Sequence, residues 1–586
     1  MKGSRSPWLY RSIVPVVAIL GLGTTVLPAS AAGTDVRVNV ANPPVPFATD
    51  KAAEAAIAIN PANTDMVAAG AFDEVDEAPC GTAQSSASRP CPFVTGVGTS
   101  GVYFSFDRGH TWAQPTYTGW TAASGSAGPG SIHTLPWYFE AGLQSDADSA
   151  VAFGPTPDAN GHFSWSNGSR FYYANLVSNG GFPGEEPIKG FEAVGVSRID
   201  DPTPARIHVK ANWFAPVLVS AHMSSTTFED KEQVWADNAS SSPFFGHAYV
   251  CFADFRGNSF FPQANEPQPL IIATSTDGGA TWAQRQVTPA ASSQTSGQGF
   301  GRSGCTIRTD SHGVVYVFAE QFASNLGALP EHGSHIMFKS FDGGMSWTNA
   351  VPLFSITDPC YFFDPLEGRC VFDGIAGGRS DLSASPSVDI ANGAPDGSGA
   401  TNAIVDAWSD GGSGINAEVT KLAWSTDGGA SWSRQIVPTN GRSFYTAPAL
   451  SPDGSKVYLA NTAFTTPFQN TTASPRLLVS GFYSAPMTAA GPGAWATEVV
   501  GARGDARAGS SNGLPFEFLG DYDYASASRT YGVGVWTADA RDAADCPAID
   551  AYRQSLYSSS PLPKPNPASA CPGSFGHIEI RGATTG

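Results

Sequence analysis

The sequence predicts an all-β protein folded as a β-propeller with seven four-stranded antiparallel blades. Three observations predict it: one turn pattern occurs four times, pairs of alternating strands begin seven times, and an unpartnered alternating strand lies near the N-terminus. A single four-stranded sheet cannot bury both of its faces, so repeated sheets of this kind pack radially around an axis. Six blades with an additional decoration is the alternative.

The first 31 residues have the order of a secretory signal peptide. Basic residues come first, an apolar run covers 13–27, and the small residues Ala29-Ser30-Ala31 follow. Proline and glycine interrupt the apolar run, and it is shorter than the roughly 20 apolar residues of a membrane span. We therefore expect cleavage near Ala31, export from the cell, and one propeller domain over residues 35–582.

Four segments share the pattern Ser-x-Asp-x-Gly-x-Ser/Thr-Trp. Glycine permits the positive φ of a tight turn, the Asp and hydroxyl side chains can bond to turn amides, and the Trp can pack on a neighbouring sheet. The pattern resembles the Asp boxes (BNR repeats) of sialidases, of other propeller glycosidases and of sortilin-type receptors. The resemblance implies that each box lies on the outer hairpin of a blade and is structural. The boxes cover 105–112, 275–282, 340–347 and 425–432.

A short apolar strand followed by a turn and an alternating strand marks the start of each predicted blade. These starts lie near Ala55, Ser149, Gln233, Cys305, Ser385, Ala447 and Leu519. The last unit ends one strand early, while the alternating segment from Asp35 has no partner of its own. We predict that this segment supplies the outer strand of the last blade, which closes the ring and removes free sheet edges. No helix longer than a turn or two is expected.

Eight cysteines in an exported chain predict disulfides. Three pairs are close in sequence and bracket loops rich in Pro or Gly, which leaves a fourth pair, although the sequence alone cannot fix the pairing. The pairs are Cys80 with Cys91, Cys360 with Cys370, Cys546 with Cys571, and Cys251 with Cys305.

The chain is acidic, with 51 Asp and Glu against 32 Lys and Arg and a net charge of −19. Nucleic acids and anionic lipids need clustered basic side chains to displace their counterions. The composition therefore predicts a secreted, extracellular monomer that binds neither nucleic acid nor membranes.

The inner strands of a propeller all start at one face, so the residues at these starts converge on the mouth of the axial channel. Charged residues recur there, and the catalytic candidates come from this set. They are Asp146, Asp148, Asp230, Glu517, Asp521 and Tyr522. The resemblance to sialidases implies a tyrosine nucleophile activated by a carboxylate, with a second carboxylate as acid/base. Tyr522 with Asp521 or Glu517 fits the first role, and Asp146, Asp148 or Asp230 fits the second.

Three arginines occur as Gly-Arg-Ser before three consecutive inner strands. Sialidases bind the substrate carboxylate with three arginines from different blades, and the planar guanidinium suits this task. The resemblance therefore implies a substrate-binding set of Arg302, Arg379 and Arg442, with Tyr445 beside them. Sialidases also carry Phe/Tyr-Arg-Ile/Leu-Pro before the first inner strand, and the corresponding stretch from Val45 contains no arginine. A pair of carboxylates that cleaves a neutral or uronic glycan is the alternative.

Together these features predict a secreted glycoside hydrolase of sialidase-like architecture that acts on extracellular glycans at the channel mouth. A non-catalytic propeller that binds glycans or proteins and a polysaccharide lyase remain the alternatives. No cofactor is required by this chemistry, and the histidines show no zinc-type clustering. Calcium is the one metal with suitable ligands, since Asp146 with Asp148 and Asp521 with Asp523 supply the oxygens that it prefers.

Overall fold

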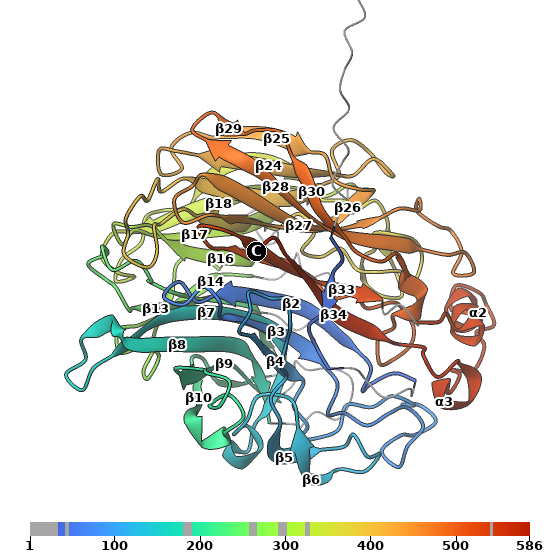
Figure 1. The fold of residues 1–586 in the computed structure, drawn as a ribbon. Coiled ribbons are helices and arrows are strands. Elements are labelled where there is room, and N and C mark those ends of the chain that lie inside the picture. The colour runs from blue at the N-terminus through green and yellow to red at the C-terminus, as the bar shows by residue number, and fades with distance from the viewer. Residues whose placement is uncertain are drawn as a thin grey trace, which may run out of the picture. The chain divides into compact units, whose positions relative to one another are not determined.

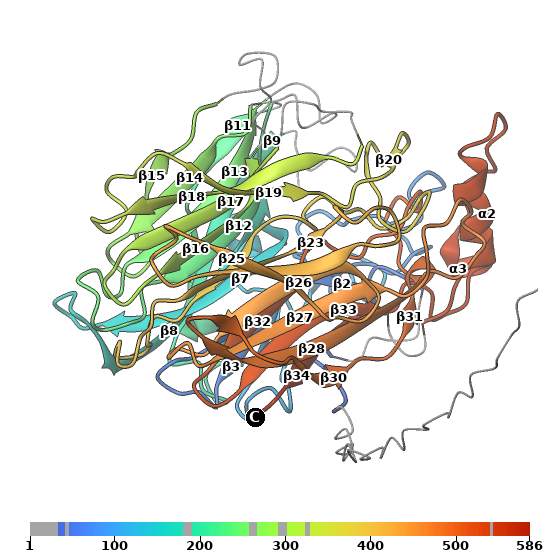
Figure 2. The same ribbon diagram turned by 90° about the horizontal axis from the view of Figure 1, so that it is seen from above.

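Seven antiparallel sheets are arranged in a ring in the computed structural model (Figures 1 and 2). The structure describes residues 33–40, 46–179, 190–224, 226–256, 267–290, 302–322, 329–539 and 543–586. The prediction of a seven-bladed all-β propeller is therefore confirmed, and the six-bladed alternative is wrong. The expected signal peptide lies outside the described residues.

Each blade runs from an inner strand at the axis to an outer strand. Blade 1 contains β2 (Ala52–Ile59), β3 (Val67–Asp73) and β4 (Ser100–Ser105). Blade 2 contains β7 (Gln144–Pro157), β8 (Phe163–Ser178), β9 (Gly190–Asp200) and β10 (Trp213–Leu218), with β11 (His222–Ser224) also on β9. Blade 3 contains β12 (Thr227–Ala236), β13 (Ala248–Arg256), β14 (Leu270–Ser275) and β15 (Ala283–Gln286). Blade 4 contains β16 (Arg302–Thr309), β17 (Val315–Phe322), β18 (His332–Ser340) and β19 (Val351–Thr357).

The second half of the ring repeats this order. Blade 5 contains β22 (Ser387–Ile390), β23 (Ile404–Asp410), β24 (Val419–Ser425) and β25 (Ser433–Val437). Blade 6 contains β26 (Arg442–Leu450), β27 (Lys456–Phe464), β28 (Leu477–Thr488) and β30 (Ala496–Val500), with β29 (Gly491–Pro492) and β31 (Gly504–Asp505) also on β28. Blade 7 contains β32 (Tyr524–Ala527), β33 (Gly532–Asp539), β34 (Ile578–Thr584) and β1 (Val36–Arg37). Two small hairpins lie outside the blades: β5 (Tyr117–Thr121) with β6 (Gly128–Ile132), and β20 (Phe363–Asp364) with β21 (Arg369–Cys370).

The N-terminal strand closes the ring, as predicted. In β1, Val36 lies opposite Gly582 and Arg37 lies opposite Arg581 of β34, in antiparallel register. Asp35, just before β1, accepts a hydrogen bond of 2.9 Å from Arg581. The two ends of the chain therefore share one blade. Blade 1 departs from the predicted four strands, because its outer position is taken by a single bridge between Phe104 and Ala113.

Apolar side chains fill the gap between each pair of neighbouring blades. Phe104 and Tyr173 belong to the cluster between blades 1 and 2, and Trp536 belongs to the cluster between blades 6 and 7. Similar clusters occupy the other five gaps. Both faces of each sheet are thereby buried, which explains why the strands are rich in β-branched and aromatic residues.

The four Asp boxes form the outer hairpins of blades 1, 3, 4 and 5. In the second box, Ser275 donates to Asp277, and Asp277 accepts from both the backbone N–H and the hydroxyl of Thr281 at 2.9 and 2.6 Å. The carbonyl of Gly278 then accepts from Arg170 of blade 2 at 2.7 Å. The Asp277 carboxylate thus accepts hydrogen bonds within its own turn, and the turn carbonyl binds a side chain of the neighbouring blade.

Replacing Asp277 by alanine is expected to lower the free energy of unfolding by about 1–3 kcal/mol, because turn bonds to a charged acceptor are lost. These bonds hold the pKa of Asp277 below its usual range although burial opposes them. The stabilisation is therefore present above the pKa of the unfolded chain and is lost as pH falls through the folded value. Urea denaturation at pH 7 and pH 3 measures both effects, and an equal loss at the two pH values would contradict this origin.

Helices are confined to the loops of the described ranges. The α-helices are α2 (Pro547–Ser555) and α3 (Pro567–Ala570), and the 3-10 turns are Phe139–Ala141, Lys210–Asn212 and Ala506–Ala508. With nine residues, α2 is longer than the turn or two that we expected. The sequence does contain a signal for α2, because a proline follows Cys546 at the first position of the helix. The surrounding residues have the composition of a loop, so we did not predict a helix there. None of these helices is long and apolar enough to span a membrane.

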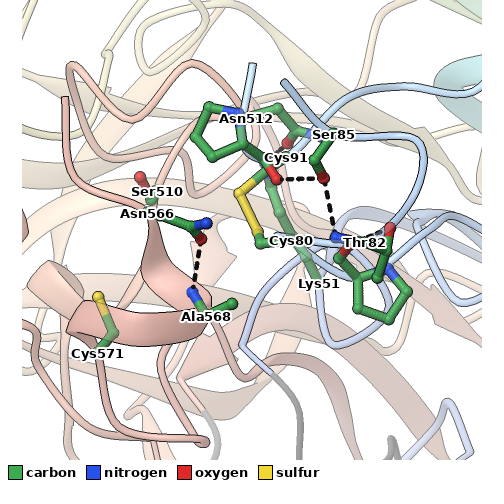
Figure 3. The surroundings of a disulfide bond; sticks show 12 residues. Lys51, Cys80, Thr82, Ser85, Cys91, Ser510, Asn512, Asn566, Ala568 and Cys571 are labelled. Atoms are coloured by element: carbon green, nitrogen blue, oxygen red, sulfur yellow. Dashed lines mark hydrogen bonds between the residues drawn. A yellow bond between two sulfur atoms is a disulfide. The ribbon is translucent and has the colours of Figure 1, made fainter. Parts of the chain in front are cut away.

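The disulfides are those suggested by the spacing of the cysteines. They join Cys80 to Cys91, Cys251 to Cys305, Cys360 to Cys370, and Cys546 to Cys571. Figure 3 shows that Cys80–Cys91 lies near Asn566 and Ala568, at the start of α3. Cys251–Cys305 differs from the others, because it joins blade 3 to the inner strand of blade 4 rather than closing a short loop.

Candidate active site

Four successive inner strands carry the same irregularity near their starts. The pairing of β2, β7, β12 and β16 with the next strand shifts register, and one residue in each shift has a positive φ. These residues are Glu54 at 59°, Asp148 at 53°, Lys231 at 54° and Gly304 at 60°. A residue with a side chain pays about 1–3 kcal/mol for such a conformation, and strain of this kind concentrates at functional sites. The bulges re-aim the side chains of Glu54, Asp148 and Lys231.

Carboxyl groups from four blades meet at these bulges; we call Glu54, Asp148, Asp230 and Asp521 the mouth carboxylates. The carboxyl group of Asp148 lies close enough to those of Glu54 and Asp230 to raise the pKa of both. Asp521 is held in a two-pronged contact with Arg379, at 2.7 Å from Nε and 2.5 Å from Nη2. The same Nη2 lies 3.4 Å from Glu54. The structure thus brings together Asp148, Asp230, Asp521 and Arg379, which the sequence singled out, with Glu54.

Burial and mutual repulsion control the protonation of this group. Burial, followed by the charge of Asp148, raises the pKa of both Glu54 and Asp230 well above the usual range for carboxylic acids. Burial also raises the pKa of Asp521, but the guanidinium of Arg379 opposes this and favours the charged carboxylate. Arg379 therefore favours the charged form of Asp521 more strongly than that of Glu54 or Asp230, and acid–base pairs depend on such differences between neighbouring carboxyl groups.

Replacing Glu54 by glutamine is expected to raise the melting temperature at pH 8. A carboxyl whose pKa is raised on folding destabilises the fold progressively as pH rises from its unfolded pKa through its folded pKa. The variant removes this penalty and keeps the shape of the side chain, so its advantage should shrink towards pH 4. Thermal melts of both proteins between pH 4 and 8 measure the effect. A difference in melting temperature that does not depend on pH would show that ionisation of Glu54 does not destabilise the fold.

Two tyrosines and a lysine lie beside the mouth carboxylates. The Lys231 ammonium lies 3.2 Å from the ring centroid of Tyr522 and donates to the Tyr524 hydroxyl at 3.1 Å. The Tyr522 hydroxyl donates to the carbonyl of Ser149 at 3.3 Å. Burial, followed by the charges of Asp148 and Glu54, raises the pKa of Tyr522 well above its usual range. Tyr522 is therefore held as a neutral phenol, bonded to a backbone carbonyl and not to a carboxylate.

Lys231 and Glu54 are the site residues that sequence reasoning did not assign a role. Lys231 stands between Asp230 and Glu232, and this acidic context could have drawn attention to it. Its position depends on the bulge in β12, which aims it at Tyr522. Spacing along the strand does not reveal a bulge, so only the structure could place this ammonium.

Two acidic candidates lie apart from the mouth carboxylates. Glu517 is buried beside Arg476 and Arg553, at 3.3 and 3.7 Å, in a network that anchors α2. Asp146 accepts from Gln144 at 3.0 Å on the other side of the bulge in β7. Burial raises the pKa of Asp146 to about 6. Their surroundings give both carboxyl groups structural partners.

The arginine set does not gather as an open clamp in the described residues. Arg442 is 3.2 Å from Glu418 and donates to the Thr466 carbonyl, while the ring of Phe372 covers its guanidinium. The buried hydroxyl of Tyr445 bonds to backbone carbonyls, including that of Gly520 at 2.8 Å. The side chain of Arg302 lies outside the described residues. Of the two arginines whose side chains are described, Arg379 contacts the mouth carboxylates and is already paired with Asp521.

The acidic pairs named as calcium ligands diverge. Asp523 accepts from Thr462 at 2.6 Å and Asp146 accepts from Gln144 at 3.0 Å, whereas Asp521 is bound to Arg379. Within the described ranges, one set of three candidate ligand side chains lies close together, but two of its members, Cys360 and Cys370, are joined in a disulfide. Calcium binding thus stays a prediction, to be tested by titration.

No family model matches the chain, and no curated protein sequence is similar to it. Solved structures of three kinds of enzyme are similar at low identity. An α-L-arabinofuranosidase of glycoside hydrolase family 93 from Fusarium graminearum, solved with arabinobiose, is 11% identical with a TM-score of 0.41, over 74% of this chain and 93% of that chain. A Hadza microbial sialidase is 10% identical with a TM-score of 0.37, over 86% and 94%. An ulvan lyase of polysaccharide lyase family 25 is 10% identical with a TM-score of 0.38, over 86% and 93%. None of these similarities establishes a family, so the function proposed below rests on the site residues alone.

Proposed function

We propose that the protein is a secreted glycoside hydrolase that cleaves an extracellular glycan at the mouth carboxylates. The observation that carries this is the pairing of Asp230 with Asp148 beside an Asp521 held by Arg379. A neutral carboxylic acid next to a charged carboxylate supplies the two groups that glycoside hydrolysis requires.

Asp230 is the proton donor in this proposal. It is half-buried, whereas the carboxyl of Glu54 is sealed in the interior with 1% of its surface exposed. Asp230 gives its proton to the glycosidic oxygen as the bond from that oxygen to the anomeric carbon breaks. As that bond breaks, Asp521 either takes a proton from the water that attacks the anomeric carbon or attacks that carbon itself. In the second case water later hydrolyses the glycosyl ester, giving its proton to Asp230 and releasing Asp521. Burial, Asp148 and then the charge of Asp521 keep the pKa of Asp230 high.

A neutral glycan suits the mouth better than an acidic one. Four carboxyl groups converge there, and Arg379 and Arg442 are bound to Asp521 and Glu418. A sialoside or uronide carboxylate would have to compete for these arginines and would meet like charge. The exo-α-sialidase and lyase alternatives both need a cation for that group. A further cation beside the mouth carboxylates, Lys231, is covered by Tyr522 and bonded to Tyr524, so these alternatives are second choices.

Hydrolysis of a glycan panel by the purified mature protein tests the proposal. The panel contains arabino-, galacto- and gluco-oligosaccharides, sialosides and uronides, with and without calcium, and lyase activity is followed separately by absorbance of the unsaturated product. We expect reducing ends from a neutral glycan and none from an Asp230→Asn, Asp521→Asn double variant. Asp277→Asn, which alters an Asp box, is the matched control and should stay active. A folded protein inactive on the whole panel would favour the non-catalytic binding propeller instead.

A further inference from the structure

A second cavity lies on the propeller axis, separate from the mouth carboxylates. It has a volume of about 260 Å³ and is lined by inner strands of blades 1, 2, 3 and 7, with residues of the other blades. A much smaller cavity of about 30 Å³ lies beside Asp521 and Tyr522. Tyr524 borders both cavities and is anchored by Lys231 and by Gln233, which donates to its hydroxyl at 2.7 Å. Tyr524 therefore divides the channel into two compartments.

The wall of the axial cavity holds an ion pair, Arg308 with Asp389, in which one arginine donor is left without a hydrogen-bond partner in the described ranges. Arg308 Nη1 donates to Gln233 at 2.7 Å, but Nε has no hydrogen-bond partner among the described residues and lies 3.5 Å from Asp389 Oδ1. Asp389 uses its other oxygen to accept from the N–H of Leu450 at 2.8 Å. A separation of 3.5 Å is too long for a good hydrogen bond. A ligand with adjacent hydroxyls could accept from the Arg308 guanidinium with one and donate to the Asp389 carboxylate with the other.

About half of the remaining wall is apolar. Ile57, Phe153, Val234 and Ala525 line it, and Trp235 stacks under the Arg308 guanidinium at 4.5 Å. Small-molecule sites combine such walls with a few placed polar groups. Because the charges of Arg308 and Asp389 balance, the fitting ligand is neutral. A single sugar ring has this character, since neighbouring hydroxyls accept and donate while its C–H faces are apolar.

The cavity is reached from the face opposite the mouth carboxylates. The loop 391–402 crosses that end, because Arg529 of blade 7 donates to the carbonyls of Gly393 and Ser398, and Trp165 of blade 2 donates to that of Pro395. At the rim, Arg529 and Thr530 line the cavity and are exposed. A ligand can therefore enter past this loop without passing the site of the proposed hydrolysis.

We propose that the axial cavity is a second binding site that takes one neutral sugar ring against the Arg308–Asp389 pair in its wall. Ligand-observed NMR titrations with arabinose, galactose and glucose test it, with acetate and glycine as charged and zwitterionic probes. We expect saturable binding of at least one sugar, weakened at least tenfold by Asp389→Ala and by Arg308→Met. The binding should be unchanged in Asp230→Asn, which separates it from the proposed active site.

A crystal soaked with the tightest sugar provides an independent readout if either cavity variant fails to fold. Density for the ring beside Arg308 supports the site, whereas an empty cavity with density only at the mouth carboxylates overturns it. Absence of saturable sugar binding, or binding of acetate alone, also overturns it. Arg529→Ala loosens the loop 391–402 and should speed ligand exchange without a comparable change in affinity.

Discussion

Replacing Asp230 by asparagine is expected to lower kcat on the responsive glycan by about 10²- to 10⁴-fold, the usual contribution of a general acid. Asparagine keeps the shape of the side chain but has no acidic proton for the leaving oxygen. KM should change little, because the half-buried carboxyl gives its proton only as the bond breaks. Steady-state rates of the wild type and the variant measure the effect.

The pH profile distinguishes this role from a structural one. Burial and the charge of Asp148 raise the pKa of Asp230, so wild-type kcat should fall as pH rises through that raised value. The variant should lack this limb, and a substrate with a good leaving group should restore much of its rate. Equal loss on good and poor leaving groups would assign the proton transfer to another residue.

Replacing Asp406 by alanine is expected to destabilise the propeller by about 3–5 kcal/mol, because it leaves an unpaired charge in the core. His335 and Asp406 are fully buried between blades 4 and 5, with 2.7 Å between Nδ1 and the carboxylate. The other ring nitrogen, Nε2, lies 2.7 Å from the carbonyl of Ala384. Two acceptors require two ring protons, so the imidazolium form is bound.

The pH dependence of the stability lost in Asp406→Ala tests whether His335 and Asp406 form an ion pair. Burial lowers the pKa of His335, but Asp406, the Ala384 carbonyl and the nearby Glu320 outweigh burial and raise it. The pair therefore stabilises the fold below the unfolded histidine pKa, and the stabilisation is lost as pH rises through the folded value. Guanidinium melts of wild type, Asp406→Ala and Asp406→Asn at pH 5.5 and 9 measure this. Asparagine keeps an acceptor and should cost less; equal costs at both pH values would contradict an imidazolium.

Local patterns were sufficient to predict the architecture of the ring. The Asp boxes are visible because one turn needs Ser, Asp, Gly and Trp at fixed offsets, and each turn closes within eight residues. The closure by β1 could be predicted by counting the strands of each blade. The last blade is one strand short, and the alternating segment near Asp35 has no partner of its own in the sequence pattern. The predicted disulfides agree with the structure because three of them close short loops.

The tertiary structure decided which candidate residues meet. Asp146 and Asp148 are two positions apart, and in a regular strand their side chains would share a face. The bulge in β7 separates them, sending Asp148 to Glu54 and Asp230 while Asp146 stays with Gln144. Likewise the arginine motif predicted a shared clamp, yet Arg442 is drawn to Glu418 and only Arg379 reaches Asp521.

The sequence by itself determined the repeating unit and the strand that closes the ring, because hydrogen bonding and turn chemistry act over a few residues. It favoured seven blades over six, and the assembled ring decided between them. Only the tertiary structure decided the composition of the mouth carboxylates, the neutral state of Tyr522 and the axial cavity around Arg308. These features depend on side chains from blades far apart in sequence and on bulges that spacing does not reveal. Burial and charge, which set their chemistry, are properties of the assembled ring.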